Sequence, residues 1–397
     1  MSPSIRSSFF RHVGQTSPEP DGFEVGHGEG IYLFDKAGNK FIDCISGIAV
    51  SSMGHGHPRI KDAIKKQLDL HLHTMVYGEH IQNSQVALAE KLAALLPEKL
   101  ACTFFTNSGT EAVEGSLKLA RKYTSRYEII ACDNAYHGST AGAESLRSDI
   151  AHTAGARPLV PGIRHIHFNA FEDIELINGQ TAAVIIEPVQ GEAGAIAPSV
   201  GYLMALRKRC DQTGTLLIFD EIQTGMGRTG SMWAFEHENV LPDILLLAKA
   251  FGGGLPLGAF VSSQQIMSVL SHDPILGHLT TFGGHPLSCA ASLEAIAITL
   301  DNKLPAKANA FEKIIRSKLE HHHALVGISG RGLMLALNLL DPDQLLPAVK
   351  ACRQHGLLVD WFLFNNRAIR LAPPLIISEE EVNMICEKLI LSLDSLQ

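Results

Sequence analysis

Two apolar runs, TLLIF at residues 215–219 and ILLLA at residues 244–248, decide the fold of this chain. Each run is nearly continuous in apolar residues, which is typical of a strand buried on both faces of a mostly parallel sheet. A charged side chain follows each run at once, Asp220 after the first and Lys249 after the second. Because ligands of open α/β sheets bind beyond the carboxyl ends of the strands, we expect both side chains at a functional site.

Four further runs of this kind alternate with amphipathic stretches that are typical of helices. The runs are TFFT (103–106), EIIAC (128–132), AAVIIE (182–187) and GAFVS (258–262), and the amphipathic stretches include 111–123 and 202–212. This alternation predicts an α/β fold in which helices flank both faces of the sheet.

The pattern divides the chain into three parts. Residues 1–50 hold an irregular lead and a hairpin, IYLFD–KAGN–KFIDC, and we expect them to join a small domain. Residues 51–300 carry the α/β pattern of a large domain. Residues 301–397 predict a smaller α+β domain, with a basic helical stretch over 306–323 and a last helix from Glu379.

Composition excludes several classes of protein. The 397 residues carry a net charge of −8 without a long basic run, which argues against nucleic acid or an anionic membrane as the main partner. No stretch approaches the ~18 apolar residues of a membrane span, and the N-terminus lacks the apolar core of a signal peptide. Seven scattered cysteines without a CxxC pair indicate free thiols in a reducing compartment. We therefore expect a cytoplasmic protein.

Lys249 and Asp220 together suggest pyridoxal-phosphate (PLP) chemistry. Lys249 stands between an apolar strand and a glycine-rich loop, and burial there lowers a lysine's pKa and frees its nucleophilic form. A lysine alone at such a place is more often solvated. A buried carboxylate such as Asp220, however, is what keeps the ring nitrogen of PLP protonated.

A phosphate site is predicted where Asn107-Ser108-Gly109-Thr110 follows a strand and opens a helix. Backbone N–H groups at a helix N-terminus suit a dianion, although Ser108 or Thr110 could equally cap the helix. Tyr136 follows another strand and could stack on a flat cofactor, although a lone tyrosine is more often a packing residue. No GxGxxG or GxxxxGK[ST] pattern points to a dinucleotide or P-loop site.

The same residues lie in blocks that resemble the class III aminotransferases, in order, over about residues 25–395. The blocks are SGIAVSSMGHGHP (46–58), NSGTEAVEGSLKLAR (107–121), YHG (136–138), IIEPVQGEAG (185–194), LLIFDEIQTGMGRTG (216–230), LLAKAFGGGLPLGA (246–259), TTFGGHPLSCAA (280–291) and IRLAPPL (369–375). The resemblance implies the fold-type I PLP architecture as a homodimer with shared active sites.

The resemblance also implies roles for single residues. Lys249 is the Schiff-base lysine and moves a proton during catalysis. The other implied cofactor contacts are Asp220 at the ring nitrogen, Gln223 at the 3′ oxygen, Tyr136 on the ring face, Ser108, Gly109 and Thr110 at the phosphate, and Thr281 at the phosphate of the partner subunit. Arg370 is implied to bind the α-carboxylate of glutamate or 2-oxoglutarate, and Glu192 to pair with Arg370 when an amine is bound there.

The branch that this chain resembles most is the N-acylornithine aminotransferases. Ile48 fits that branch, because an acylated nitrogen has no charge to satisfy. The implied reaction moves the terminal (δ) amine of N-acetyl- or N-succinylornithine to 2-oxoglutarate, giving the N-acyl-glutamate semialdehyde and glutamate, as in arginine biosynthesis. Many members carry FHGR, whereas this chain has Ser139 in place of the arginine that grips the distal carboxylate. Arg147 or Arg164 could replace it, or the substrate's distal group could differ.

Other interpretations stay open. Ornithine or 4-aminobutyrate could be the amine donor. An aminomutase or epimerase would share the fold, and a PLP-binding regulator would need an attached DNA-binding segment. The run His321-His322-His323 is expected on a solvated helix face, where consecutive side chains diverge, and we assign no metal site.

Overall fold

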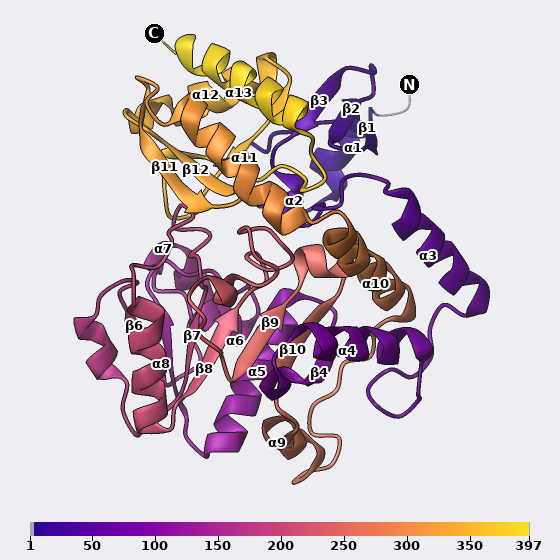
Figure 1. The fold of residues 1–397 in the computed structure, drawn as a ribbon, viewed down its shortest axis with the longest axis vertical. Helices are drawn as coiled ribbons and strands as arrows, with labels where there is room; N and C mark the ends of the chain where they lie inside the picture. The colour runs from indigo at the N-terminus through magenta and orange to yellow at the C-terminus, as the bar shows by residue number, and fades with distance from the viewer. Residues whose placement is uncertain (1–3, 397) are drawn as a thin grey trace.

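A seven-stranded sheet forms the centre of the larger part of the molecule (Figure 1). The structure is a computed structural model that describes residues 4–396. The strand order is β4-β10-β9-β8-β7-β5-β6; β10 runs antiparallel to β4 and β9, and the other neighbours pair in parallel. The strands are β4 (Cys102–Thr106), β5 (Glu128–Cys132), β6 (Ile163–Ile166), β7 (Thr181–Ile186), β8 (Leu216–Asp220), β9 (Ile244–Leu247) and β10 (Gly258–Ser262).

Both faces of this sheet are buried, which explains its nearly continuous apolar runs. Along β8, Leu217 and Phe219 pack into one core cluster, whereas Leu216 and Ile218 pack into another on the opposite face. The first cluster includes residues of α3 (Pro58–Leu70), α4 (Asn83–Leu95), α8 (Tyr202–Thr213) and α10 (Pro286–Asp301), and the second includes residues of α5 (Gly109–Thr124), α6 (Ala141–Ser145) and α9 (Gln264–Met267).

The predicted fold class is confirmed, and all six predicted strands are present within one or two residues of their expected bounds. The sequence pattern missed β6 at the edge of the sheet. Its residues Ile163–Ile166 include Arg164 and His165, and most of the strand is only half-buried, so it carries no continuous apolar run. An edge strand has a neighbouring strand on one side only, so its residues can stay partly exposed and need not all be apolar.

Two four-stranded sheets form the smaller part, with the orders β1-β2-β3-β13 and β11-β12-β15-β14. The predicted hairpin is present, with Phe34 opposite Lys40. Strand β13 pairs in parallel with β3, so the first 50 residues meet the C-terminal segment. We therefore propose domain boundaries near residues 50 and 300. The remaining elements are α1 (Ile5–His12), β1 (Val25–Glu29), β2 (Tyr32–Asp35), β3 (Lys40–Asp43), α2 (Ser46–Ala49), α7 (Ile150–Thr153), α11 (Leu304–Leu319), β11 (Leu325–Arg331), β12 (Met334–Leu339), α12 (Leu345–Gln354), β13 (Leu357–Leu358), β14 (Asp360–Trp361), β15 (Ala368–Leu371) and α13 (Glu379–Asp394).

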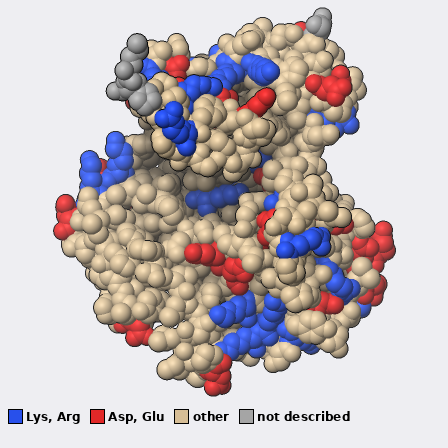
Figure 2. Space-filling model, turned by 180° about the vertical axis from the view of Figure 1, so that it is seen from behind, with Lys and Arg blue, Asp and Glu red and all other residues tan. Residues whose placement is uncertain are grey.

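Figure 2 shows a hollow between the upper and lower parts of the molecule. Buried Arg228, in the loop after β8, joins the large part to the small sheets. It is 1% exposed. Its guanidinium donates to the carbonyl oxygens of Leu333 and Pro373 at 3.0 and 2.6 Å, and to Ser52 Oγ at 2.7 Å. One side chain thus supplies donors to three segments that are far apart in the sequence. Among the helices of residues 4–396, none is long and apolar enough to cross a bilayer.

Arg228→Met should destabilise the protein by about 3 kcal/mol, because it leaves three buried acceptors without a donor. Chemical denaturation measures this loss. The matched control is Arg59→Met, which removes an exposed arginine paired with Glu294 and Asp301 and should cost less than about 1 kcal/mol. Equal losses in both variants would show that the buried bonds of Arg228 carry no special weight.

Candidate active site

A cavity of about 570 Å³ opens at the carboxyl ends of the parallel strands β7, β8 and β9. The parallel topology brings the ends of these strands to one edge of the sheet, as the sequence predicted. The lining includes most of the predicted site residues, namely Ser108, Gly109, Thr110, Tyr136, Glu192, Asp220, Gln223 and Lys249.

Asp220 is buried at the end of β8 and is held by two donors. Its Oδ2 lies 2.7 Å from Nδ1 of His137, and its Oδ1 accepts from the Ile222 N–H at 3.0 Å. Burial alone would lower the pKa of His137, but its hydrogen bond to Asp220 and the charge of that carboxylate leave the pKa raised. His137 therefore favours the protonated form that balances the charge of Asp220. The sequence motif contained His137, but nothing in it showed that the two side chains meet.

Lys249 begins the short 3₁₀ turn after β9 and adopts a φ of 50°, in the left-handed region. Burial lowers its pKa, and the nearby Glu192 carboxylate opposes that effect only in part. A lowered pKa increases the fraction of neutral amine near neutral pH, which is the nucleophilic form. Lys249 is thus half-buried in the cavity wall, between β9 and the glycine-rich loop where the sequence places it.

The N-terminus of α5 faces the same cavity. Ser108 caps the helix, since its Oγ accepts from the Glu111 N–H at 3.3 Å, and Thr110 Oγ1 lies 2.6 Å from Thr140 Oγ1. Gly138 packs so closely on Thr110 that a Cβ at this position would collide with the Thr110 side chain. The first-turn N–H groups of a helix lack intrahelical acceptors, so this end suits an anion such as phosphate.

Glu187, at the end of β7, received no role from the sequence, although its place after a buried strand was visible there. Its carboxylate accepts from the Tyr136 N–H at 3.1 Å and from the Gly191 N–H at 2.7 Å. Burial raises its pKa to about 7; the nearby His137 acts to lower the pKa, and the charge of Asp220 acts to raise it. Glu187 thus fixes the backbone of Tyr136 and lies beside the Asp220–His137 pair.

Arg370 and Glu192 form a buried, two-pronged ion pair, as expected from the sequence. Nη1 and Nη2 of Arg370 donate to the two carboxylate oxygens of Glu192 at 2.8 and 2.9 Å. Burial works against ionisation of Glu192, but the Arg370 guanidinium outweighs it and lowers the pKa. Nε of Arg370 lies 3.1 Å from Asp360, its cross-strand neighbour on β14, which the sequence did not single out. Burial raises the pKa of Asp360 to about 6.

Several positions discussed from the sequence lie outside the cavity lining, among them Arg147 and Arg370, the second of which lines a small neighbouring cavity with Gln223. Ile48 is in a left-handed turn over 46–49, with φ of 59°, and the neighbouring Val50 lines the cavity in its place. Thr281 is exposed on the loop before α10 and does not reach the cavity of its own chain. Arg164 lies on β6, where Glu128 holds its guanidinium at 2.6 and 2.7 Å.

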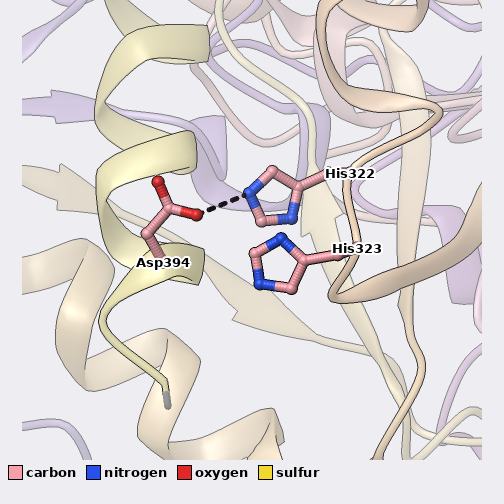
Figure 3. Close-up of side chains that lie close together, drawn as sticks. All are labelled: His322, His323 and Asp394. Carbon is pink, nitrogen blue, oxygen red and sulfur yellow. Dashed lines mark hydrogen bonds and ion pairs between the residues drawn. The ribbon is translucent and has the colours of Figure 1, made fainter.

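The expectation that the three histidines lie on a helix is wrong. Helix α11 ends at Leu319, and the turn after it brings His322 and His323 into a stack with ring centres 4.5 Å apart, beside Asp394 (Figure 3). Nδ1 of His322 accepts from the Ala324 N–H, so its Nε2 carries the proton and donates to Asp394 at 3.2 Å. That tautomer offers no Nε2 lone pair to an ion. We interpret the group as a surface hydrogen bond.

Comparison with known proteins agrees with this geometry. A sequence model of the family described as Aminotransferase class-III matches residues 16–393. The chain belongs to the class III aminotransferases. The ornithine aminotransferase of Toxoplasma gondii ME49 is 30% identical, with 98% of this chain and 94% of that chain covered and a TM-score of 0.91.

Two further structures resemble this aminotransferase. An ornithine aminotransferase from Toxoplasma gondii, with partial occupancy of PLP at its active site, is 31% identical, covers 99% of this chain and 94% of that chain, and has a TM-score of 0.91. An (S)-enantioselective omega-transaminase from Thermomicrobium roseum is 27% identical, covers 99% and 98% of the two chains, and has a TM-score of 0.91. The protein is therefore a PLP-dependent transaminase with the fold-type I architecture.

The residues of this aminotransferase fit PLP. The cavity combines a half-buried lysine, a buried carboxylate and a helix N-terminus, which match the aldehyde, the ring nitrogen and the phosphate of the cofactor. The close contact of Gly138 with Thr110 shows that the backbone is tightly packed at the phosphate end. Within the described residues, Lys249 is the one lysine or arginine in the cavity wall.

The raised pKa of Glu187 predicts a dependence of stability on pH. The folded chain binds this proton more tightly than the unfolded chain, whose carboxyl has a pKa of 4.5. Its contribution to stability is thus present below pH 4.5 and is lost as the pH rises through about 7. Glu187→Gln removes this titration. Between pH 5 and pH 8 the free energy of unfolding of the variant should therefore rise by about 2 kcal/mol relative to that of wild type.

Denaturation at the two pH values, at equal cofactor saturation, measures this difference. The control is Glu387→Gln on the exposed face of α13, which should track wild type at both pH values. A Glu187→Gln variant that also keeps a constant offset from wild type would contradict the buried titration.

Proposed function

We propose that this aminotransferase moves the terminal amine of an ω-amino compound to 2-oxoglutarate, which leaves as glutamate. The Arg370–Glu192 pair carries the proposal. With the pair closed, the fork of Arg370 is neutralised, so a donor without a carboxylate beside its amine meets no free cation there. When Glu192 turns away, the same fork can bind the α-carboxylate of 2-oxoglutarate in two parallel hydrogen bonds.

Within this proposal each polar group of the cavity has a task. Lys249 holds the cofactor and moves a proton at the reacting carbon of the substrate, and its lowered pKa suits a proton acceptor. Asp220 faces the ring nitrogen, and Gln223 donates to the 3′ oxygen. When bound, PLP supplies the electron sink that stabilises negative charge at the carbon that loses its proton.

The remaining cofactor contacts concern its ring face and its phosphate. Tyr136 packs on the ring face, where Glu187 fixes its backbone. Ser108, Gly109 and Thr110 bind the phosphate through the N-terminus of α5. Because these groups are held by buried hydrogen bonds, they orient the cofactor before any substrate enters.

We propose N-acylornithine, acetylated or succinylated, as the first donor to test, with the N-acyl-glutamate semialdehyde as product and a place in arginine biosynthesis. Ile48 supports an uncharged nitrogen at the far end, since its apolar side chain lies two residues before Val50 of the cavity lining. Ornithine is a second candidate, supported by the similarity to two ornithine aminotransferase structures. Other ω-amines such as 4-aminobutyrate are supported by the similarity to an omega-transaminase.

We also propose a homodimer in the cytoplasm. Large apolar side chains are exposed around the loops near residues 68–86 and 275–282, the second of which carries Thr281. Such a surface suits a subunit interface, and there Thr281 would reach the phosphate of the partner subunit. Seven free cysteines, six of them buried, suit a reducing compartment.

Lys249→Ala should abolish turnover and the visible absorbance of the covalently held cofactor, because no other lysine or arginine lies in the described cavity wall. Absorbance spectra and single-turnover assays measure both losses. The control is Lys303→Ala, which removes an exposed lysine before α11. Turnover at the wild-type rate in the Lys249 variant would refute the assignment.

The donor itself is tested by mixing the enzyme with single amines in the absence of a keto acid. N-acetylornithine, N-succinylornithine, ornithine and 4-aminobutyrate form the panel, and loss of cofactor absorbance reports the first half-reaction. We expect one acylornithine to react at least about tenfold faster than ornithine, an energy gap of about 1.4 kcal/mol. Reaction with ornithine or 4-aminobutyrate alone would replace the acylornithine by that donor, and continued turnover without any keto acid would indicate an aminomutase.

A further inference from the structure

Arg147 is a buried cation beside the cavity that the mechanism does not use. It follows α6 and is 6% exposed. Its guanidinium carbon lies 5.6 Å from the ring centre of Tyr136, which lines the cavity, and 5.6 Å from the ring centre of Phe364. Arg147 therefore lies between the wall of the cavity and a loop of the small sheets.

The loop on the other side of Arg147 belongs to the substrate end of the site. The Phe364 N–H donates to the carbonyl oxygen of Glu192 at 3.0 Å, and the Leu363 N–H donates to the Glu192 carboxylate at 3.2 Å. Glu192 in turn holds Arg370. Arg147 therefore lies between Tyr136 of the cavity wall and a loop that contacts the Arg370–Glu192 pair.

The hydrogen bonds of Arg147 are incomplete. Its Nη1 and Nε lie at 3.4 Å from Glu144 and Asp149, the long end of the range for a charged pair. Asp149 also accepts from the backbone and ring of His152, so it is shared. Nη2 of Arg147 is buried without a partner. A buried charged donor without an acceptor is costly, and a bound anion would remove that cost.

The other cations near the cavity are already committed. Lys249 is the reacting amine, and Arg370 is paired with Glu192 and Asp360. Arg164 lies on the far edge strand β6, where Glu128 of β5 holds it. Ser139 lines the cavity with a small side chain whose hydroxyl lies 3.4 Å from the Tyr136 hydroxyl. It leaves the space beside Tyr136 open and offers no charge.

We propose that Arg147 binds a carboxylate at the far end of the amine donor, so that the donor is an ω-amino acid and not a plain amine. The carboxylate reaches Nη2 when the Phe364 ring moves aside, and the Tyr136 ring keeps its contact with the guanidinium. This inference rests on the proposed function, since it assigns the distal group of the same terminal-amine donor.

The test compares two probes of equal chain length, 5-aminopentanoate and pentylamine, which differ in the distal carboxylate. Loss of cofactor absorbance without a keto acid gives the rate and the apparent dissociation constant for each. Wild type should prefer 5-aminopentanoate. Arg147→Met should weaken binding of 5-aminopentanoate by about 10- to 100-fold, the range for a hydrogen bond to a charged group, and leave pentylamine unchanged.

Three controls separate binding from structure. The half-reaction with L-alanine, whose single carboxylate enters through Arg370 and which has no distal carboxylate, should stay at the wild-type rate in Arg147→Met. Arg164→Met removes the other candidate arginine and should keep the preference of wild type. Ser139→Arg in the Arg147→Met background places a guanidinium on the cavity side of Tyr136 and should restore part of the preference.

The inference alone is overturned by a preference for 5-aminopentanoate that survives Arg147→Met, or by an equal loss for both probes and L-alanine, which marks a structural role. Wild type that reacts faster with pentylamine also overturns it but leaves the proposed transfer of a terminal amine intact. Wild type that reacts with glutamate and with neither probe nor any ω-amine of the panel overturns the proposed function as well.

Discussion

The amine of Lys249 is enclosed in the cavity wall beside carboxyl groups, and the cost of enclosing it shapes the charges of the site. An amine inside a protein costs free energy unless it is neutral or paired, and burial lowers the pKa of Lys249 while Glu192 opposes that shift. Two neighbouring strand ends supply carboxyl groups near it, Glu187 directly after β7 and Asp220 at the end of β8, while Lys249 itself follows β9. Their convergence follows from parallel pairing, which brings the carboxyl ends of neighbouring strands to one edge.

The small sheets complete the site from the opposite side. Arg370 projects from β15, and its fork holds Glu192 of the large part, while Asp360 of β14 occupies its Nε side. Arg228 fixes the two parts relative to each other through three buried hydrogen bonds. A substrate carboxylate that displaces Glu192 therefore meets a guanidinium that remains anchored by its strand and by the Trp361 carbonyl oxygen.

Buried charge in this protein is arranged in pairs that can exchange partners. Glu192 is the partner of Arg370 in the closed pair, and His137 is the partner of Asp220. Arg147 is paired more weakly, because its two carboxylate neighbours stand at 3.4 Å; its Nη2 is buried without an acceptor, as is Nε of Arg370. Because the guanidinium of Arg147 is only weakly paired between the cavity wall and a loop of the small sheets, a ligand carboxylate can add most to binding there.

The α/β class, six of the seven strands of the large sheet and the places of Asp220 and Lys249 after two of them follow from the sequence alone. Continuous apolar runs report burial on both faces, and the residue after each run lies at the functional edge. The edge strand β6 escaped notice because half-burial leaves no apolar run, and the turn at His321–His323 was mistaken for a helix because a polar stretch carries no helical stop signal there. Which charges meet depends on the packing of distant segments: His137 meets Asp220, Asp360 meets Arg370, and Arg147 meets the Tyr136 ring, while Arg164 is held on the far edge. These contacts join residues up to 83 positions apart, as in the His137–Asp220 pair, and no local pattern encodes which distant partner a buried charge will find.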